Sequence, residues 1–211
     1  MKNSVIVLGA GGHAKVVIEI LISAGHQVSY CVGGENSPKE CLGVPVLQGD
    51  DHLFKLLDAG YSLIFPAIGS NFVRQRAATH AVQLGFTLVN AISPHAIVSP
   101  SLVLGKGIAI MSGAVINAQC DIADLVIINT GATIDHDCHI GISVHVAPQC
   151  AIAGNVKIGR GAFLGIGTVV IPDINIGNYS VIGAGSVVIS DIPPSSTAVG
   201  NPARILLKEP R

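Results

Sequence analysis

The segment Asp135-His136-Asp137-Cys138-His139 combines residue types that can perform acid–base chemistry. An imidazole beside a carboxylate is the usual form of a general base, so we interpret His136 as the base and Asp137 as the group that orients it. A zinc site is the competing interpretation, because His and Asp clusters also bind zinc, but a closed set of four ligands at local spacing is missing. Covalent chemistry by Cys138 is disfavoured, because the repeat described below directs its side chain inward.

A second chemical signal is the glycine turn Gly9-Ala10-Gly11-Gly12-His13-Ala14, which follows an apolar strand and opens a helix. This is the context in which a turn binds phosphate at a helix N-terminus. An NAD site would need an acidic residue at the end of the second strand, where the chain has Val32-Gly33-Gly34 and reaches Glu35 only just beyond. We therefore expect a nucleotide sugar rather than NAD, and a merely tight turn is the alternative. His13 is a poor capping residue but well placed to contact a ligand.

The elements that position this turn alternate between strand and helix over residues 1–92, which predicts an α/β, Rossmann-like domain with a parallel sheet. The expected strands are Ser4–Leu8, Val28–Val32, Ser62–Ile68 and Phe86–Ala91, and the expected helices are His13–Ala24, Asp51–Ala59 and Asn71–Leu84. A loop through Pro38 and Pro45 is expected between the second strand and the second helix. The turn Gly69-Ser70-Asn71 ends the third strand at the same carboxyl edge as the first glycine turn, where ligands of open α/β sheets bind.

The elements that position His136 show a different sequence pattern from the strand–helix alternation of residues 1–92. From Val98 to Val188 every sixth residue is aliphatic, without insertion or deletion, and the residues two positions before them are mostly small or apolar. A period of six fits neither an α-helix nor a plain strand. It predicts an all-β left-handed parallel β-helix of hexapeptide repeats over residues 93–211, with three short strands per coil and a C-terminal cap.

A coil of eighteen residues places positions eighteen apart directly above one another, about 4.8 Å apart along the axis. Ala118, His136, Gly154 and Pro172 should therefore share one corner. His145 lies half a coil after His136, on the opposite side of the prism. The two histidines can meet only across a subunit boundary, so we expect a homotrimer with active sites between subunits.

Composition excludes several other classes of function. The formal net charge is −1, which gives no electrostatic basis for binding nucleic acid or an anionic membrane. We expect no transmembrane helix and no secretory leader. Three of the five cysteines, Cys120, Cys138 and Cys150, fall in the inward column, which favours reduced thiols and a cytoplasmic location.

Together these stretches resemble the sialic acid O-acetyltransferase-like (NeuD/PglD-type) family of hexapeptide-repeat sugar acetyltransferases, most closely its GDP-perosamine N-acetyltransferase branch. The matching stretches are Gly9–Lys15, Ala67–Asn71, Val89–Ile92, Ile128–Ala132, Asp135–Cys138, Ala153–Val156, Phe163–Gly165 and Gly200–Ala203. The resemblance implies transfer of acetyl from acetyl-CoA to the 4-amino group of a nucleotide-linked 4-amino-4,6-dideoxy sugar, without a metal. It implies surface polysaccharide or glycan biosynthesis as the setting.

The resemblance also implies roles for individual residues. His136 would be the base and Asp137 its orienting partner. The acetyl-CoA contacts would be His145, the backbone N–H of Gly154 as oxyanion donor, and Ile166 and Ala184 along the pantetheine arm. The nucleotide-sugar contacts would be Gly11, Gly12, His13, Gly69, Ser70 and Asn71.

Three alternatives remain open at this point. The first is an O-acetyltransferase acting on a free sugar of the sialic acid type, and the second is a non-catalytic protein that only binds a nucleotide sugar. The third is a zinc β-helix resembling carbonic anhydrase, which would need His136, His139 and His145 to converge. Relatives usually carry Asp in the segment that reads Gly33-Gly34-Glu35 here, so the sequence does not name the nucleotide or the sugar.

Overall fold

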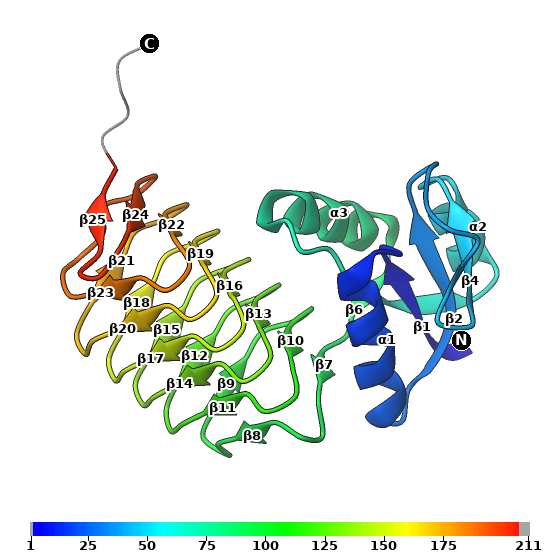
Figure 1. The fold of residues 1–211 in the computed structure, drawn as a ribbon. Coiled ribbons are helices and arrows are strands. Elements are labelled where there is room, and N and C mark those ends of the chain that lie inside the picture. Colours follow the sequence, from blue (N-terminus) through cyan, green and yellow to red (C-terminus); the bar gives the residue numbers. More distant parts are fainter. Residues whose placement is uncertain (1, 207–211) are drawn as a thin grey trace, which may run out of the picture. The chain divides into compact units, whose positions relative to one another are not determined.

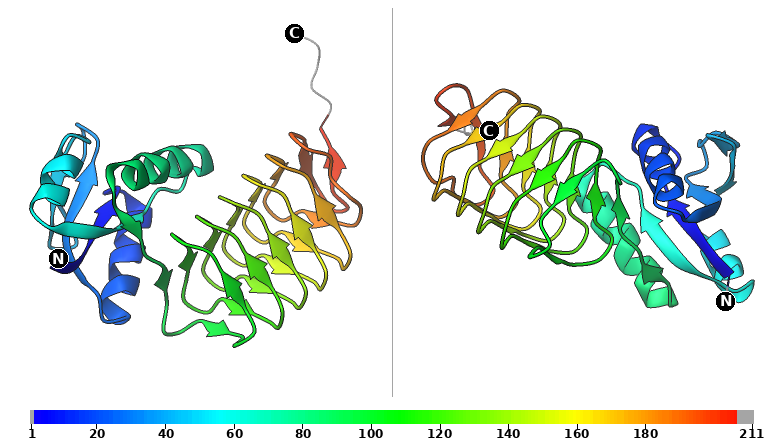
Figure 2. Two further views of the ribbon diagram at one scale, coloured as in Figure 1. Left: turned by 180° about the vertical axis from the view of Figure 1, so that it is seen from behind. Right: turned by 90° about the horizontal axis from the view of Figure 1, so that it is seen from below.

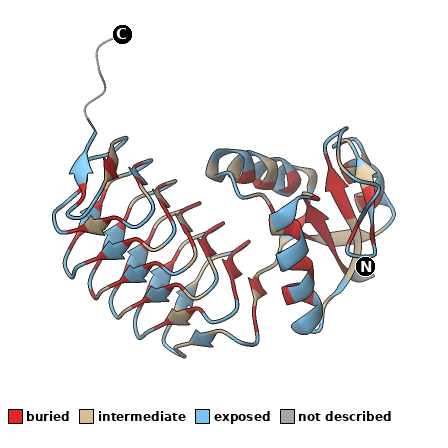
Figure 3. Ribbon diagram, in the orientation of Figure 1, coloured by how far each residue is buried: buried red, intermediate tan, exposed pale blue. Residues whose placement is uncertain are grey.

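The computed structural model describes residues 2–206, which form two compact units (Figures 1 and 2). The first unit extends to Pro94 and includes Lys106–Ala109, and the second contains His95–Gly105 and the residues from Ile110 onward. Each unit has a core of its own, visible as the buried segments in Figure 3.

The first unit is built on a six-stranded sheet in the order β3-β4-β2-β1-β5-β6. Its elements are β1 (Lys2–Leu8), α1 (Gly12–Ser23), β2 (Gln27–Gly33), β3 (Glu40–Cys41), β4 (Val44–Gln48), α2 (His52–Asp58), β5 (Tyr61–Pro66), α3 (Asn71–Leu84) and β6 (Thr87–Leu88). All neighbours pair in parallel except β3 and β4. The sequence-based prediction of a Rossmann-like parallel sheet is confirmed.

Alternating side chains of β1 explain the packing of this unit. Ile6 and Leu8 belong to a buried cluster with Leu53 and Leu56 of α2 and Ala81 of α3. The helix α1 packs against β1 and β2 through a buried apolar stripe, as its 3.6-residue pattern predicts. The packing brings the β1–α1 and β5–α3 turns to the carboxyl edge of neighbouring strands.

Two predicted details of this unit are wrong. The expected loop through Pro38 and Pro45 contains the hairpin β3–β4, whose turn residues Leu42 and Gly43 both have positive φ angles of 49° and 77°. Leucine at the first turn position hides the usual Asn-Gly or Asp-Gly hairpin signal. The expected strand Phe86–Ala91 is two strands, because the Asn90 side chain accepts the N–H of Ile108 and the chain leaves the first sheet there.

The second unit is a left-handed parallel β-helix, as predicted, and its strands form three faces. The eight-stranded face contains β7 (Ala91–Ile92), β10 (Ala109–Ile110), β13 (Ile127–Ile128), β16 (His145–Val146), β19 (Phe163–Leu164), β22 (Val181–Ile182), β24 (Thr197–Val199) and β25 (Arg204–Ile205). The six-stranded face contains β8 (Ile97–Val98), β11 (Val115–Ile116), β14 (Thr133–Ile134), β17 (Ala151–Ile152), β20 (Val169–Val170) and β23 (Val187–Val188). The five-stranded face contains β9 (Val103–Leu104), β12 (Asp121–Ile122), β15 (His139–Ile140), β18 (Lys157–Ile158) and β21 (Asn175–Ile176).

The six-residue columns are the core of the β-helix. The aliphatic column is buried from Ile110 to Val188, and the column two positions earlier is buried from Ile108 to Ser186. Strand register repeats every eighteen residues, so that Val115, Thr133 and Ala151 lie side by side. The strands β24 and β25 close the last coil as an antiparallel pair and bury Ala198.

Each corner of the β-helix uses one residue with a left-handed backbone. Every sixth residue from Gly107 to Gly185 has a positive φ angle. Glycine occupies this position in some corners, and residues such as Asp137, Asn155 and Asp173 occupy it in others. The turn therefore requires a left-handed conformation but does not require glycine, although glycine adopts it most readily.

Candidate active site

His136 lies at the corner between β14 of the six-stranded face and β15 of the five-stranded face. Backbone hydrogen bonds stack this corner on its neighbours: Asp137 N donates to Ala118 O over 3.0 Å, and Asn155 N donates to His136 O over 2.9 Å. The predicted column of positions 118, 136 and 154 is therefore confirmed. The main chain on either side holds the histidine in place, while its side chain projects outward.

The His136 ring is paired with Asp137. Nδ1 of His136 lies 2.7 Å from Oδ2 of Asp137, and the two side chains are 60% and 51% exposed. A carboxylate can only accept, so the neutral ring donates from Nδ1 and keeps the lone pair on Nε2. This hydrogen bond, aided by the charges of Asp135 and Asp137, raises the pKa of His136 above its usual value. An exposed imidazole oriented by a carboxylate in this way has the arrangement that general-base chemistry requires.

Gly154 lies directly against the His136 ring. A Cβ atom at Gly154 would approach Cε1 of the ring to 2.6 Å and Nε2 to 2.8 Å, which is closer than van der Waals contact allows. Pro172 occupies the equivalent position one coil further on and has no N–H. The β-helix ladder therefore does not require an N–H at this position, and Gly154 itself is buried beneath the His136 ring.

Two polar residues, to which the sequence analysis assigned no individual role, support the same corner. Oδ1 of Asp135 accepts the N–H of His136 over 2.8 Å and the Nδ2–H of Asn117 over 2.9 Å. The hydrogen bond from Asn117 is the main reason that the pKa of Asp135 lies below its usual value. Asn117 lies eighteen residues before Asp135, so the coil period was the signal that could have found this pair.

His145 lies on β16 of the eight-stranded face, away from the His136 corner of its own coil, as predicted. Its Nε2 atom is 3.1 Å from Nδ2 of Asn129, and its ring meets Phe163 edge-on at a centroid distance of 5.3 Å. His139 lies on the five-stranded face, 3.8 Å from Asp121. The three histidines of the zinc alternative thus lie on different sides of the coil. Among residues 2–206, no group of three or more His, Cys, Asp or Glu side chains is arranged to hold a metal ion.

Ile166 and Ala184 lie at the corner between the eight-stranded and six-stranded faces. The N–H of Gly185 donates to Ile166 O over 2.8 Å, which stacks one corner on the next. Ile166 is 59% exposed and Ala184 is also exposed. The two residues thus present exposed apolar side chains at successive corners along the β-helix axis.

The two glycine turns of the first unit lie side by side at the carboxyl edge of its sheet. Ala67 N donates to Leu8 O over 2.8 Å, and a Cβ at Gly9 would approach Ala67 O to 2.6 Å. Gly9 also has a φ of 113°, so its position excludes any side chain. The close approach of the turns creates one shared rim above β1 and β5.

A cavity of about 950 Å³ opens beside this rim. Its lining includes Ala10 after β1, Gly33 after β2, and Ile68 and Phe72 on the β5–α3 side. The six predicted nucleotide-sugar residues are sequence neighbours of these lining residues but do not themselves line the cavity. A Cβ at Gly33 would lie 2.7 Å from Cβ of Ser37, so this segment is packed too tightly for a side chain there.

His13 is held in an unusual environment at the start of α1. Its Nε2 atom is buried and has no hydrogen-bond partner within the described part of the chain. Burial, together with the positive charge of Arg74, lowers the pKa of His13 to about 4. His13 is therefore neutral near pH 7. Arg74 was missed at the sequence level, because nothing in the helical pattern distinguishes it from a solvated residue of α3.

Comparison with known proteins adds evidence from both units. Residues 4–81 match the model of the PglD N-terminal domain, and residues 155–190 match that of the bacterial transferase hexapeptide repeat. The chain is 48% identical to PerB from Caulobacter crescentus, solved in complex with CoA and GDP-perosamine. That match covers 98% of each chain with a TM-score of 0.94.

The chain belongs to the NeuD/PglD-type family of hexapeptide-repeat sugar acetyltransferases.

Two other solved structures resemble the chain along nearly its whole length. The acetyltransferase domain of PglB from Neisseria gonorrhoeae, in complex with acetyl coenzyme A, is 36% identical over 98% of this chain and 100% of that chain, with a TM-score of 0.91. WeeI from Acinetobacter baumannii is 26% identical over 96% and 99% of the two chains, with a TM-score of 0.86. In the protein itself, residues 2–206 include no helix that is long and apolar enough to span a bilayer.

Proposed function

We propose that the protein transfers the acetyl group of acetyl-CoA to the 4-amino group of a nucleotide-linked 4-amino-4,6-dideoxy sugar. The observation that carries the proposal is the exposed His136–Asp137 pair, packed on Gly154 at a corner of the β-helix. The relatives solved with CoA, acetyl-CoA and GDP-perosamine support both the donor and the class of acceptor. A GDP-perosamine-like sugar and a UDP-4-amino sugar are the acceptors to test first.

In this mechanism Nε2 of His136 takes a proton from the sugar amine as the nitrogen attacks the thioester carbonyl. Asp137 accepts the hydrogen bond from Nδ1, fixes the tautomer and stabilises the imidazolium that forms. The N–H of Gly154 donates to the developing oxyanion. The imidazolium then returns its proton to the departing CoA thiolate. No residue forms a covalent bond to the acetyl group.

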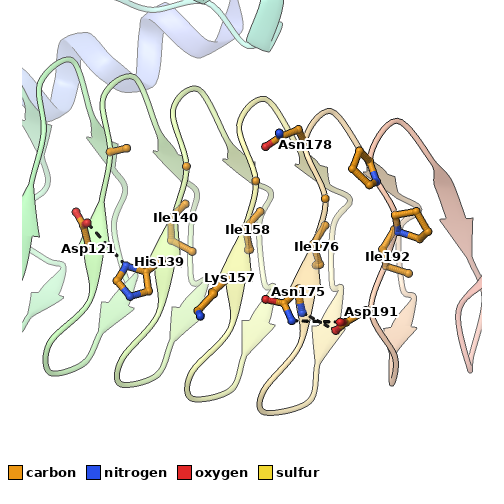
Figure 4. Close-up of a pocket in the computed structure, with 16 residues that line it drawn as sticks. Asp121, His139, Ile140, Lys157, Ile158, Asn175, Ile176, Asn178, Asp191 and Ile192 are labelled. Carbon is orange, nitrogen blue, oxygen red and sulfur yellow. Dashed lines mark hydrogen bonds and ion pairs between the residues drawn. The ribbon is translucent and has the colours of Figure 1, made fainter.

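The β-helix faces support a homotrimer that completes this site. The six-stranded face exposes aliphatic side chains, with Ile97 at 68% and Val169 at 40% exposure. The five-stranded face instead carries a polar row that includes Asp121, His139 and Lys157, along a shallow hollow of about 620 Å³ (Figure 4). Apolar surface favours burial between subunits, and polar surface favours water.

The six-stranded face lies between the His136 corner and the Ile166 corner of the same chain. If three copies pack this face around a three-fold axis, the His136 corner of one subunit comes beside the Ile166 corner of the next. His145 lies on the strand that leads into that second corner. Acetyl-CoA would then lie in the groove between subunits, with Ile166 and Ala184 along the pantetheine arm and His145 near the acetyl group.

In the first unit, the Gly11–His13 and Gly69–Asn71 turns are the proposed contacts for the nucleotide sugar. The adjacent cavity of about 950 Å³ has the size of a small-molecule site, and neutral His13 offers an unpaired Nε2 atom. We place the reaction in glycan or surface polysaccharide synthesis. All five cysteines are free and buried, which supports a location in the reducing cytoplasm.

The test is a screen of UDP-, GDP- and dTDP-linked 4-amino sugars with acetyl-CoA, followed by release of free thiol and by mass spectrometry of the product. One nucleotide amino sugar should gain a single acetyl group that resists mild base, since an amide survives where an ester is hydrolysed. His136→Ala is the matched control. An acetyl group that mild base removes, or acetylation of free sialic acid alone, would establish O-acetylation instead.

A further inference from the structure

Arg74 is a fully buried arginine in the first turn of α3, and the proposed mechanism does not use it. Burial lowers its pKa to about 10, so the guanidinium remains charged near pH 7. A buried charge is unfavourable unless the surrounding groups compensate it. The position adds to this penalty, because the N-terminal end of a helix carries partial positive charge and favours anions.

The guanidinium compensates its burial by bonding the turn that precedes α3. Nη1 donates to the carbonyl oxygens of Ile68 and Gly69 over 2.9 and 3.1 Å. Nη2 donates to Oδ1 of Asn71 over 2.9 Å. A planar guanidinium carries N–H donors on separate nitrogens and can reach three acceptors in this fixed pattern, whereas the ammonium group of lysine carries its three donors on one nitrogen.

These bonds set the direction of the turn. The carbonyls of Ile68 and Gly69 point toward the Arg74 guanidinium, which fixes the two peptide groups on either side of Gly69 at the carboxyl edge of the sheet. That edge is the rim shared with the Gly9–Gly12 turn, beside the cavity of about 950 Å³. Ser70 makes no side-chain capping bond to α3, and the side-chain hydrogen bonds of Arg74 restrain this turn together with the backbone bond from Arg74 N to Ser70 O over 2.8 Å.

We propose that Arg74 is a positioning residue, whose buried guanidinium holds the Ile68–Asn71 turn in the form that binds the nucleotide sugar. The inference rests on the proposed function, which places the sugar nucleotide at this turn. The positive charge of Arg74 also favours substrate binding. It lies close enough to His13 to lower the pKa of that ring, and it would attract the diphosphate of the substrate. Arg74 acts through the turn and does not touch the reacting atoms.

The experiment compares Arg74→Lys and Arg74→Met with Ala81→Gly, a buried position in the same helix that is distant from the turn. Both Arg74 variants should raise KM for the nucleotide sugar by about 10- to 100-fold, the range for losing a hydrogen bond to a charged group. Neither kcat at saturation nor KM for acetyl-CoA should change by more than about twofold. Ala81→Gly should lower the melting temperature and leave all three constants unchanged.

Hydrogen exchange of the substrate-free protein provides a second measurement. The amides of residues 68–71 should exchange faster in Arg74→Lys and at the normal rate in Ala81→Gly. If the wild-type enzyme acetylates no nucleotide sugar, the proposed function fails, and exchange at the turn still decides what Arg74 holds in place. A normal KM for the nucleotide sugar in Arg74→Lys would show that a positive charge at this position is enough for substrate binding, and it would overturn the proposal. So would unchanged exchange at the turn, or a rise in KM that Ala81→Gly reproduces.

Discussion

Gly154→Ala is the sharpest test of how the His136 base is positioned. The added Cβ would lie 2.6 Å from Cε1 of the ring, whereas carbon atoms at optimal contact are about 3.5–4.0 Å apart. The ring must therefore move by roughly 1 Å, which would disturb its 2.7 Å hydrogen bond to Asp137. A displacement of about 1 Å in a catalytic group can lower the rate by about 10²-fold, or about 2.7 kcal/mol in the barrier.

The fold itself should tolerate this change. Ala118 occupies the equivalent corner position two coils earlier, and Gly154 has no positive φ angle that would require glycine. The His136 ring is 60% exposed and can swing into solvent. The free energy of unfolding should therefore change by no more than about 0.5 kcal/mol, as for an ordinary surface substitution.

The assay is thiol release with the best nucleotide sugar, measured for Gly154→Ala alone and in the His136→Ala background. If Gly154 acts by making room for the ring, the second substitution should have almost no effect once the ring is gone. Wild-type turnover in the single variant would refute the reasoning about ring position. A further loss of about a hundredfold in the His136→Ala background would show instead that Gly154 acts on the acetyl group directly.

The remaining predictions concern the base, its partner and the assembly. His136→Ala should lower kcat by about 10²–10⁴-fold with little change in KM for acetyl-CoA, measured by steady-state kinetics, and near-normal turnover would exclude it as the base. Because Asp137 raises the pKa of His136, kcat/KM should fall as the pH drops through that raised value and the ring becomes protonated. Asp137→Asn should move this limb of the pH–rate profile to lower pH, and an unmoved limb would assign it to another group. Light scattering should give the mass of three chains, and Val169→Glu on the six-stranded face should dissociate them with loss of activity, whereas an active monomer would contradict the shared site. A chelator should leave activity intact, and loss of stoichiometric zinc together with activity would support the metal alternative.

The β-helix could be predicted almost residue by residue, because its register depends on a fixed period. The same period placed Ala118, His136 and Gly154 at one corner and separated His136 from His145. It could not show how closely the ring packs on Gly154, because that contact depends on the side-chain rotamer. The pairing of Asn117 with Asp135 was within reach of the period but requires looking eighteen residues back along the chain.

The first unit was less predictable, because its features depend on contacts between segments distant in sequence. The hairpin β3–β4 has an uninformative turn, and the split at Asn90 depends on a side-chain bond to Ile108. Arg74 resembles any charged residue on an amphipathic helix until the folded chain shows that it is buried. Periodicity reports which face of an element is apolar, and it does not report which polar group the fold encloses.

The left-handed corner position has a consequence for the evolvability of this enzyme. At residue 137 the backbone has a φ of 59°. Glycine adopts this left-handed conformation with the least strain, and Asp adopts it more readily than most other residues. The chain instead places the proposed partner of its base there. Asp137→Gly would relieve backbone strain while removing the carboxylate, so selection for thermal stability alone would drift toward an inert protein at this position. A laboratory evolution campaign on this scaffold should therefore hold residue 137 constant and seek robustness at the other corners, where Ser143, Gln149 and Tyr179 occupy the same strained geometry without a proposed chemical role.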